Sequence, residues 1–216
     1  FTMVREKKTL EIKVVRDTIE VPNIEYSLDK TSGVYTIALF EFTENSGALF
    51  DKAINDFRNS GSQKLIIDVR GNPGGYLDQA VSIASHFLPK GTDIVTEDYK
   101  GKEQNNTHRS YGTGGIPIDS KVVVLMNQGS ASASEILAGA LQDNKVATLI
   151  GTRSFGKGSV QQLVDVNGGS LKITVARWLT PLGRSISDGG LTPDIKAERT
   201  VADLEAKKDP QRERAI

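Results

Sequence analysis

The stretch Lys121–Asn144, KVVVLMNQGSASASEILAGALQDN, decides the fold. It opens with KVVVLM, a short and nearly all-apolar run that is typical of a strand buried on both faces. A turn at Asn127–Gly129 follows, and apolar residues then recur at helical spacing between Ile136 and Leu141. A buried strand that turns tightly into a helix is the building unit of layered α/β folds.

The same alternation extends to both sides of this stretch. Lys64–Arg70 (KLIIDVR) predicts a second buried strand, the turn GNPGG follows it, and Leu77–Leu88 has the apolar spacing of a helix. Ser46–Ser60 predicts an earlier helix with one buried face, and Val146–Ile150 predicts a later strand. We therefore expect an α/β core of largely parallel strands with flanking helices.

Other segments predict strands that no helix separates. Thr9–Ile19 alternates well enough for an N-terminal β segment, and EYSLDKTSGVYTIALFEF predicts two strands around a turn at Asp29–Gly33. Ser170–Thr180 predicts a longer strand. Lys100–Gly115 is polar and glycine-rich, which indicates a loop, and the charged end from Leu204 predicts a surface helix or a frayed tail.

Length and composition exclude several classes of protein. The 216 residues and 38% hydrophobic content predict one domain, with an appendage at most. Lys+Arg and Asp+Glu both number 27, so no basic excess indicates nucleic-acid binding. No apolar run approaches the roughly 18 residues of a membrane span. The absence of cysteine excludes a thiol nucleophile, disulfides and cysteine-ligated zinc. No signal peptide is recognisable, so we expect a fragment from which any targeting segment has been removed.

Gly151–Ser159, GTRSFGKGS, contains most of a nucleotide-binding loop. That pattern is G-x-x-x-x-G-K-[ST], and Gly158 stands where the pattern needs the hydroxyl that ligates magnesium. A phosphate loop must also open a helix, whose first amides bind the phosphates. The residues that follow, SVQQLVDVNGG, have the pattern of a strand and a turn instead. The sequence therefore disfavours an NTPase.

Three serines stand at alternate positions where the helix after Gly129 begins: Ser130, Ser132 and Ser134. A serine at a helix start is most often an N-cap, because the first backbone amides lack partners. One cap needs only one serine, so a nucleophilic serine is the alternative. That role requires a base and an oxyanion hole.

The choice of base is narrow. His86 falls on a predicted helix that already has a core face, so we expect it to be half-buried and structural. His108 falls in the polar loop, where we expect it to be solvated. Lys157 is then the remaining base, 25 residues beyond Ser132, and a helix followed by a returning strand can bring these two positions together.

These residues carry a resemblance to a known family. GSASASEILAGALQDN followed by GTRSFGKGSVQQ resembles the active-site region of the C-terminal processing peptidases, or tail-specific proteases. IIDVRGNPGGYLDQAVSIASHFLPKG and ARWLTPLGRSISDGGLTPDI resemble two further signatures of that family, in the same order, from about Ile19 to Ile195. The resemblance implies a ClpP/crotonase-like α/β core. It also implies endoproteolytic cleavage near the C-terminus of protein or peptide substrates, by a serine and a lysine without metal or cofactor.

Carried over by position, the resemblance implies that Ser132 is the nucleophile, that Lys157 is the base and that Gln161 positions the lysine. Alternation along an extended strand would place Lys157 and Gln161 on one face. The implied oxyanion hole pairs the amide of Ala133 with that of Gly74 or Gly75.

A lysine base must be uncharged, which requires burial away from carboxylates. The apolar neighbours Phe155, Val160 and Leu163 are expected to provide that burial, and Gln161 can orient the amine without charging it. Asp143 also matches a position discussed in some family members, but it lies ~16 Å from Ser132 along a helix. We therefore expect Asp143 to be a structural acid near the helix end.

The resemblance also implies a domain organisation. Residues 1–20 are expected to be the remnant of a connection between a PDZ domain and the core, residues 21–200 the protease core, and residues 201–216 a charged tail. Family location is outside the cytosol, in the periplasm, cell envelope or extracellular space, and a homo-oligomer is possible. The alternative is a non-catalytic module that binds extended peptides by strand addition on the same fold. The presence of Ser132, Lys157 and Gln161 together favours the enzyme.

Overall fold

The computed structural model describes residues 1–15, 17, 22–117 and 119–216. Within these ranges the strands are β1 (Thr2–Arg5), β2 (Lys8–Glu11), β3 (Ile24–Asp29), β4 (Val34–Leu39), β5 (Lys64–Asp68), β6 (Asp93–Asp98), β7 (Asn106–Arg109), β8 (Lys121–Met126), β9 (Thr148–Gly151), β10 (Ser159–Val166), β11 (Gly169–Leu179) and β12 (Ile195–Lys196). The helices are α1 (Ser46–Asn59), α2 (Leu77–Ala84), α3 (Ala133–Asp143), α4 (Val201–Glu205) and α5 (Pro210–Ala215).

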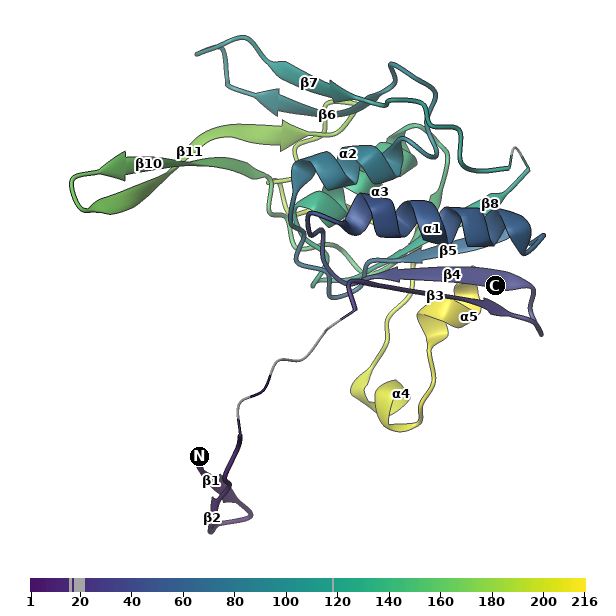
Figure 1. The fold of residues 1–216 in the computed structure, drawn as a ribbon, viewed down its shortest axis with the longest axis vertical. Coiled ribbons are helices and arrows are strands. Elements are labelled where there is room, and N and C mark those ends of the chain that lie inside the picture. Colours follow the sequence, from purple (N-terminus) through teal and green to yellow (C-terminus); the bar gives the residue numbers. More distant parts are fainter. Residues whose placement is uncertain (16, 18–21, 118) are drawn as a thin grey trace.

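A central sheet organises the body of the molecule. Its described strands follow the order β12-β9-β8-β5-β4-β3, and every neighbouring pair is parallel except β3 with β4. Helices α1, α2 and α3 cover one face of this sheet, whereas α4 and α5 lie on the other side (Figure 1). The predicted α/β core of largely parallel strands with flanking helices is confirmed.

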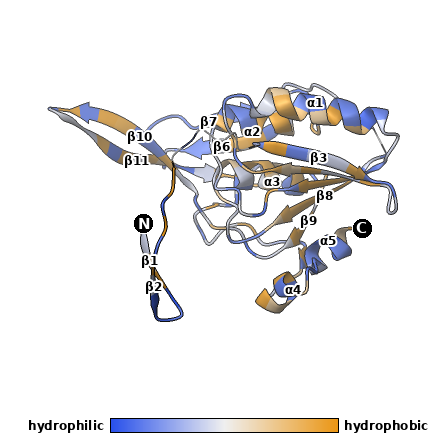
Figure 2. Cartoon of the chain, turned by 60° about the horizontal axis from the view of Figure 1, so that its bottom comes forward, coloured by the Kyte–Doolittle hydropathy of each residue, from blue (hydrophilic) through white to orange (hydrophobic). Residues whose placement is uncertain are grey.

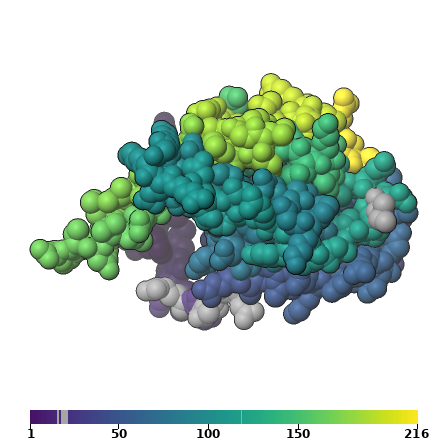
Figure 3. Space-filling view, turned by 90° about the horizontal axis from the view of Figure 1, so that it is seen from above, coloured from purple at the N-terminus to yellow at the C-terminus, as the bar shows by residue number. Residues whose placement is uncertain are grey.

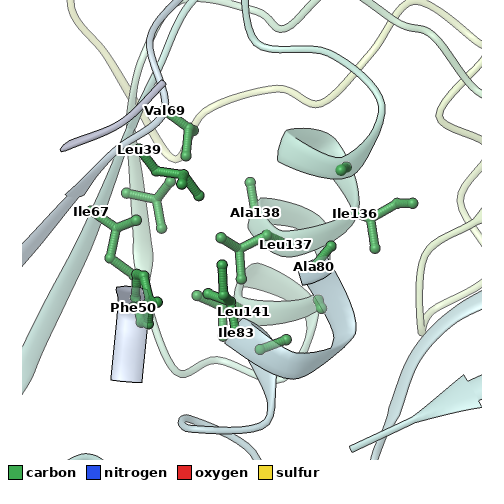
Figure 4. Packing of buried hydrophobic residues seen from close by; sticks show 14 of the residues in the cluster. Leu39, Phe50, Ile67, Val69, Ala80, Ile83, Ile136, Leu137, Ala138 and Leu141 are labelled. Carbon is green, nitrogen blue, oxygen red and sulfur yellow. The ribbon is translucent and has the colours of Figure 1, made fainter. Parts of the chain in front are cut away.

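Both faces of the central strands are buried, which explains their nearly continuous apolar runs. In β5, Leu65 and Ile67 point into the large core beneath the helices, whereas Ile66 points into a smaller cluster that Ala215 of α5 covers. Figure 4 shows the large core, where side chains of the sheet, α1, α2 and α3 meet: Leu39, Phe50, Ile67, Val69, Ala80, Ile83, Leu137 and Leu141.

A second, antiparallel sheet has the order β10-β11-β6-β7. Its β10–β11 hairpin projects away from the body (Figures 1 and 3). Strand β7 lies inside Lys100–Gly115, so the prediction that this whole segment is a loop is wrong. The residues of β7 are polar, so the sequence shows no apolar alternation there. The strand is stabilised by its hydrogen bonds to β6 and by an ion pair between Arg109 and Asp93.

The N-terminal β segment is a hairpin of β1 and β2, and all its strand residues are exposed. The predicted strand Thr9–Ile19 is wrong beyond Glu11, where β2 ends. Residues 16, 18 and 19 of that prediction, and the predicted boundary at residues 20 and 21, lie outside the described residues. None of the helices in the described part of the chain has the length and apolar character needed to cross a bilayer.

The C-terminal segment is ordered and docked, so the frayed-tail alternative is wrong. Gln211 of α5 is buried, and its amide donates to the carbonyl of Ala197 at 2.9 Å. The guanidinium of Arg70 donates from Nη1 to Asp209 at 2.9 Å and to Gln211 at 3.0 Å. The C-terminal segment is therefore attached to Arg70, the residue immediately before the GNPGG turn.

His86 lies just beyond the end of α2 rather than on the predicted longer helix. Its ring is buried beside Phe50, and Nε2 lies 2.7 Å from Asp51 Oδ1. Burial lowers the pKa of His86 below its usual value, although Asp51 opposes that shift. The native state therefore favours the neutral ring, as expected for a structural histidine.

This lowered pKa predicts how stability depends on pH. Below about pH 6.5 the unfolded chain binds a proton at this position that the folded chain disfavours, so stability is lost as pH falls. We expect the free energy of unfolding to fall between pH 7 and pH 5, and the fall to be smaller in His86→Gln. Urea unfolding at both pH values measures the free energy of unfolding. A fall in His86→Gln as large as in the parent would contradict the role of His86.

Candidate active site

Ser132 occupies a strained turn between β8 and α3. Its φ of 53° and ψ of −116° make it a non-glycine residue in a sparsely populated conformation. A sharp strand-to-helix turn of this kind holds the nucleophilic serine of many hydrolases and presents its Oγ. The backbone angles of Ser132 are of the kind found at such turns.

The other two serines have structural partners. Ser130 Oγ donates to the carbonyl of Val69 at 2.7 Å, and Ser134 Oγ donates to the carbonyl of Asn72 at 3.0 Å. Both residues are buried, whereas Ser132 is half-buried. Ser130 and Ser134 thus attach the start of α3 to the loop after β5, whereas Ser132 is the N-cap residue of α3 and its amide donates to Glu135.

Asn72 fixes the GNPGG loop against the rest of the site. Its fully buried side chain donates to the carbonyl of Leu39 at 2.7 Å and accepts from the amide of Gly74 at 2.8 Å. Its own carbonyl accepts from the amide of Ala131 at 3.0 Å. The loops after β5 and β8 therefore form one hydrogen-bonded unit with the end of β4.

Two glycines of this loop are needed for close approach. At Gly74, where φ is +102°, a Cβ would lie 2.7 Å from the Cβ of Ser132 and 2.7 Å from the carbonyl oxygen of Ala131. At Gly75, where φ is +139°, a Cβ would overlap the carbonyl of Phe42. Any larger residue would push the loop away from Ser132.

The predicted oxyanion amides are in different states. The amide of Gly74 already donates to Asn72. In the described part of the chain, the amides of Ala133 and Gly75 have no hydrogen-bond partner. Of the three predicted donors, Ala133 and Gly75 are therefore the two that remain available.

Glu135 is a site residue that the sequence reasoning missed. Its carboxylate is completely buried, and Oε2 accepts from the backbone amides of Ser132 at 2.9 Å and Lys157 at 3.0 Å. Oε1 accepts from Ser154 Oγ at 2.6 Å and from the amide of Gly156 at 2.7 Å. A signal was present, since serine followed three residues later by glutamate is a capping-box pattern.

The structure brings the backbones of Ser132 and Lys157 together, but not their side chains. One oxygen of Glu135 binds both backbone amides. The side chain of Lys157 is exposed, and no hydrogen bond joins its amine to the Ser132 hydroxyl among the described residues. Gln161 is exposed as well.

The expected burial of Lys157 by its apolar neighbours is wrong. Phe155 is 66% exposed and Leu163 is 68% exposed, and only Val160 packs against the core. The physical reason is the path of the chain, because the segment after Gly156 leads straight into the projecting hairpin (Figure 1).

Neither histidine is bonded to Ser132 in the described structure. His108 lies on β7, where Nε2 is 2.7 Å from Glu97 Oε1 and the ring meets Trp178 edge-on. Its side chain is 22% exposed, so the expectation of a solvated His108 is wrong. No cluster of three or more metal-binding side chains occurs within the described ranges.

Asp143 lies at the far end of α3 and binds the loop after β11. Its carboxylate accepts from the amide of Leu182 at 2.9 Å and forms an ion pair with Arg184. The side chain is 2% exposed. These contacts are those of a structural acid that holds the loop around residue 182 to the helix.

Comparison with known proteins gives a consistent family assignment. The model of "Peptidase family S41" matches residues 33–197. A carboxy-terminal-processing protease of Bartonella bacilliformis is 44% identical over 200 residues, which cover 90% of this chain and 45% of the relative. A carboxyl-terminal-processing protease of Picosynechococcus is 40% identical over 187 residues, which cover 85% of this chain and 44% of the relative. The chain therefore spans less than half the length of these relatives.

Solved structures share the fold. The photosystem II D1 C-terminal processing protease aligns with a TM-score of 0.76 and 30% identity, over 91% of this chain and 54% of that protein. A putative S41 protease from Bacteroides fragilis aligns with a TM-score of 0.70 over 94% of this chain and 59% of that protein. Its 18% identity supports the fold alone.

The contacts of Glu135 predict a large effect of a small substitution. Glu135→Gln replaces one acceptor oxygen by an amide donor that must face two other donors. We expect the free energy of unfolding to fall by about 2 kcal/mol or more, because buried donors lose their acceptor. Ser154→Ala is the comparison variant; it keeps the carboxylate but removes one donor to it and the acceptor of the Leu191 amide, so it should cost about 1–2 kcal/mol. Equal stability of Glu135→Gln and the parent in urea unfolding would refute this role.

Proposed function

The chain belongs to peptidase family S41, and we propose that it is the catalytic core of a serine endopeptidase that cleaves protein substrates near their C-termini. The observation that carries the proposal is the strained turn at Ser132, which packs against Gly74 and is joined to the Lys157 segment through Glu135. Strain at a single non-glycine residue persists only where the surrounding structure enforces it, and such residues gather at active sites.

In the proposed reaction, Ser132 Oγ attacks the carbonyl carbon of the scissile peptide bond. The uncharged amine of Lys157 accepts the hydroxyl proton and then donates it to the leaving amine. Gln161 orients the lysine amine without adding charge. Water completes the cycle by hydrolysing the acyl-enzyme, again with Lys157 as the base.

The tetrahedral intermediate needs donors for its oxyanion. The amides of Ala133 and Gly75 support this role because both lack other partners among the described residues. The amide of Ala133 also opens α3, where the helix dipole favours negative charge. One such donor contributes about 10²–10³ in kcat in other hydrolases.

The exposed side chain of Lys157 requires a further step before catalysis. A lysine base must be uncharged, which requires water to be excluded from its amine. We infer that bound substrate covers this side chain and excludes water from it, so that catalysis starts only in the complex.

The wider organisation of the protein is part of the same proposal. We propose that residues 21–200 are the protease core, residues 1–20 its connection to a PDZ domain and residues 201–216 a charged tail attached to the core. Substrates would be proteins with flexible C-termini that are met outside the cytosol, and the active form could be a homo-oligomer. The family resemblance supports these assignments.

The alternative function is a non-catalytic module that binds peptides on the same fold. Such a module needs no strained serine, no free oxyanion donors and no lysine at position 157. A peptide that carries a fluorophosphonate group at its scissile position separates the two functions, because its chain covers Lys157 and its phosphorus then labels an activated serine, whereas an inactive serine stays unmodified.

The strain at Ser132 predicts opposite effects on stability and activity. Ser132→Gly should abolish fluorophosphonate labelling and peptide cleavage, yet raise the free energy of unfolding by about 1 kcal/mol, because glycine adopts the required φ without strain. Ser132→Ala should be equally inactive without that gain. Ser130→Ala and Ser134→Ala are the controls, since they should lose stability but keep the labelling site. Labelling that survives in Ser132→Ala would show that another serine reacts.

The role of Lys157 predicts which substitutions retain activity. Lys157→Arg should be nearly as inactive as Lys157→Ala, because a guanidinium stays charged and cannot accept a proton. Gln161→Ala should be milder, since it moves no proton. Gln161→Glu should be worse than Gln161→Ala and should shift activity to higher pH, because the carboxylate favours the charged lysine. Peptide cleavage from pH 6 to 10 measures these effects, and substantial activity of Lys157→Arg would refute the base assignment.

A further inference from the structure

The β10–β11 hairpin carries an open sheet edge that begins beside Lys157. Strand β10 stands first in the order β10-β11-β6-β7, so one of its two edges has no partner strand in the described structure. The strand runs from Ser159 to Val166, and its last six residues are exposed. Figure 3 shows the hairpin standing clear of the body, with space on its outer sides.

The pairing register shows which backbone groups of β10 face that edge. The carbonyl of Gly158 accepts from the amide of Trp178, and Ser159 lies opposite Arg177. Ser159 and Arg177 are therefore a pair without mutual hydrogen bonds, and the amide and carbonyl of Ser159 point to the open edge. The register shifts between Val160 and Gln161, so beyond it the alternation is counted from the turn: Val166 and Gly169 enclose two residues and form a hydrogen-bonded pair, which points the backbone groups of Leu163 and Gln161 to the open edge.

The composition of this edge is suited to pairing. Natural proteins usually protect exposed edges with lysine, proline or a very short strand. The sequence of β10, SVQQLVDV, has neither lysine nor proline and carries one charge, at Asp165. Leu163 is 68% exposed and Val166 is 51% exposed, and Figure 2 shows apolar residues along the hairpin. An edge with these properties favours a neutral or apolar extended segment.

We propose that the open edge of β10 binds the polypeptide substrate as an added strand and leads it past Lys157 and Ser132. This inference rests on the proposed function and names the recognition mode for the same site. The position of the edge supports this occupant, because β10 follows Lys157 after one intervening residue and Glu135 holds the amide of Lys157 to that of Ser132. A strand added here would run beside the predicted catalytic residues.

Strand addition also fits the proposed substrate class and the exposure of Lys157. Main-chain hydrogen bonds recognise an extended peptide with little dependence on its sequence. In addition, a strand that continues along the open edge beyond Ser159 would run beside the exposed side chain of Lys157 and exclude water from it.

Peptide binding to the Ser132→Ala chain tests the proposal without depending on cleavage. The probe is a fluorescein-labelled peptide of about ten residues with apolar residues at alternate positions, enough to span one strand. Single backbone N-methyl groups are placed at each position in turn, and dissociation constants are measured by fluorescence anisotropy. We expect alternation with a period of two: methylation of amides that face β10 weakens binding about three- to tenfold, and methylation of the others has little effect. A flat profile, or no binding, would overturn the proposal.

A pair of variants on the protein side completes the test. Leu163→Pro removes an amide that points to the open edge, so the pairing with β11 should persist. Leu163→Ala removes the side chain and keeps the amide. We expect Leu163→Pro to weaken peptide binding about three- to tenfold relative to Leu163→Ala, with circular dichroism confirming that both variants are folded. Equal binding by the two folded variants would overturn the proposal.

Two further measurements separate this inference from its rivals. Cleavage of the unmethylated peptide by the parent chain, followed by mass spectrometry, tests the catalytic proposal, whereas binding to Ser132→Ala does not depend on catalysis. Alternating peptide binding without cleavage would uphold the edge and reject the enzyme, and cleavage with a flat binding profile would do the reverse. Sedimentation of the unliganded parent, Leu163→Ala and Leu163→Pro tests self-pairing; a dimer that only the proline variant dissociates would assign the edge to a second copy and overturn the proposal.

Discussion

The buried carboxylate of Glu135 is the interaction on which the arrangement of the site depends. Removing a carboxylate from water costs several kcal/mol unless its oxygens gain comparable hydrogen bonds. Three backbone amides and the hydroxyl of Ser154 supply them in the described structure, and the residue lies in the first turn of α3, where the helix dipole favours negative charge. These donors come from two segments, and each segment must keep its conformation for the carboxylate to remain satisfied. The strained turn at Ser132 and the loop before β10 are therefore stabilised together.

The rest of the site follows from the parallel sheet. Strands β5 and β8 run side by side, so the loops that leave their carboxyl ends meet at one edge, which is where α/β sheets usually bind ligands. Asn72 from the first loop and Ser134 from the helix after the second one hydrogen-bond each other there. Gly74 then approaches Ser132 so closely that no side chain fits between them. The sheet brings the two loops together, and the glycines set the distance between their backbones.

The sequence predicted the features that depend on local pattern. Strands β5 and β8 were recognisable because both faces are buried, and α1 and α3 because their apolar residues recur at helical spacing. Strand β7 was missed because it is polar and depends on its partner β6. The capping-box spacing of Ser132 and Glu135 was visible, but only the fold shows that the carboxylate also binds the amide of Lys157, a partner 22 residues away. Likewise, three equivalent serines in the sequence become different once the loop after β5 packs against two of them.

The expected burial of Lys157 failed for the same reason, because burial depends on the path of the chain and not on the local sequence. Apolar neighbours in sequence bury a side chain only if the chain folds back over it, and the segment after Gly156 runs outward into a hairpin instead. The apolar side chains of Phe155 and Leu163 are therefore left in water together with the lysine. Exposed apolar residues and an open strand edge are both costly for an isolated protein, and the same ligand, an extended polypeptide, would cover both. In the proposed mechanism the surroundings that a lysine base needs are then completed by the substrate, so that binding and activation of the base are one event.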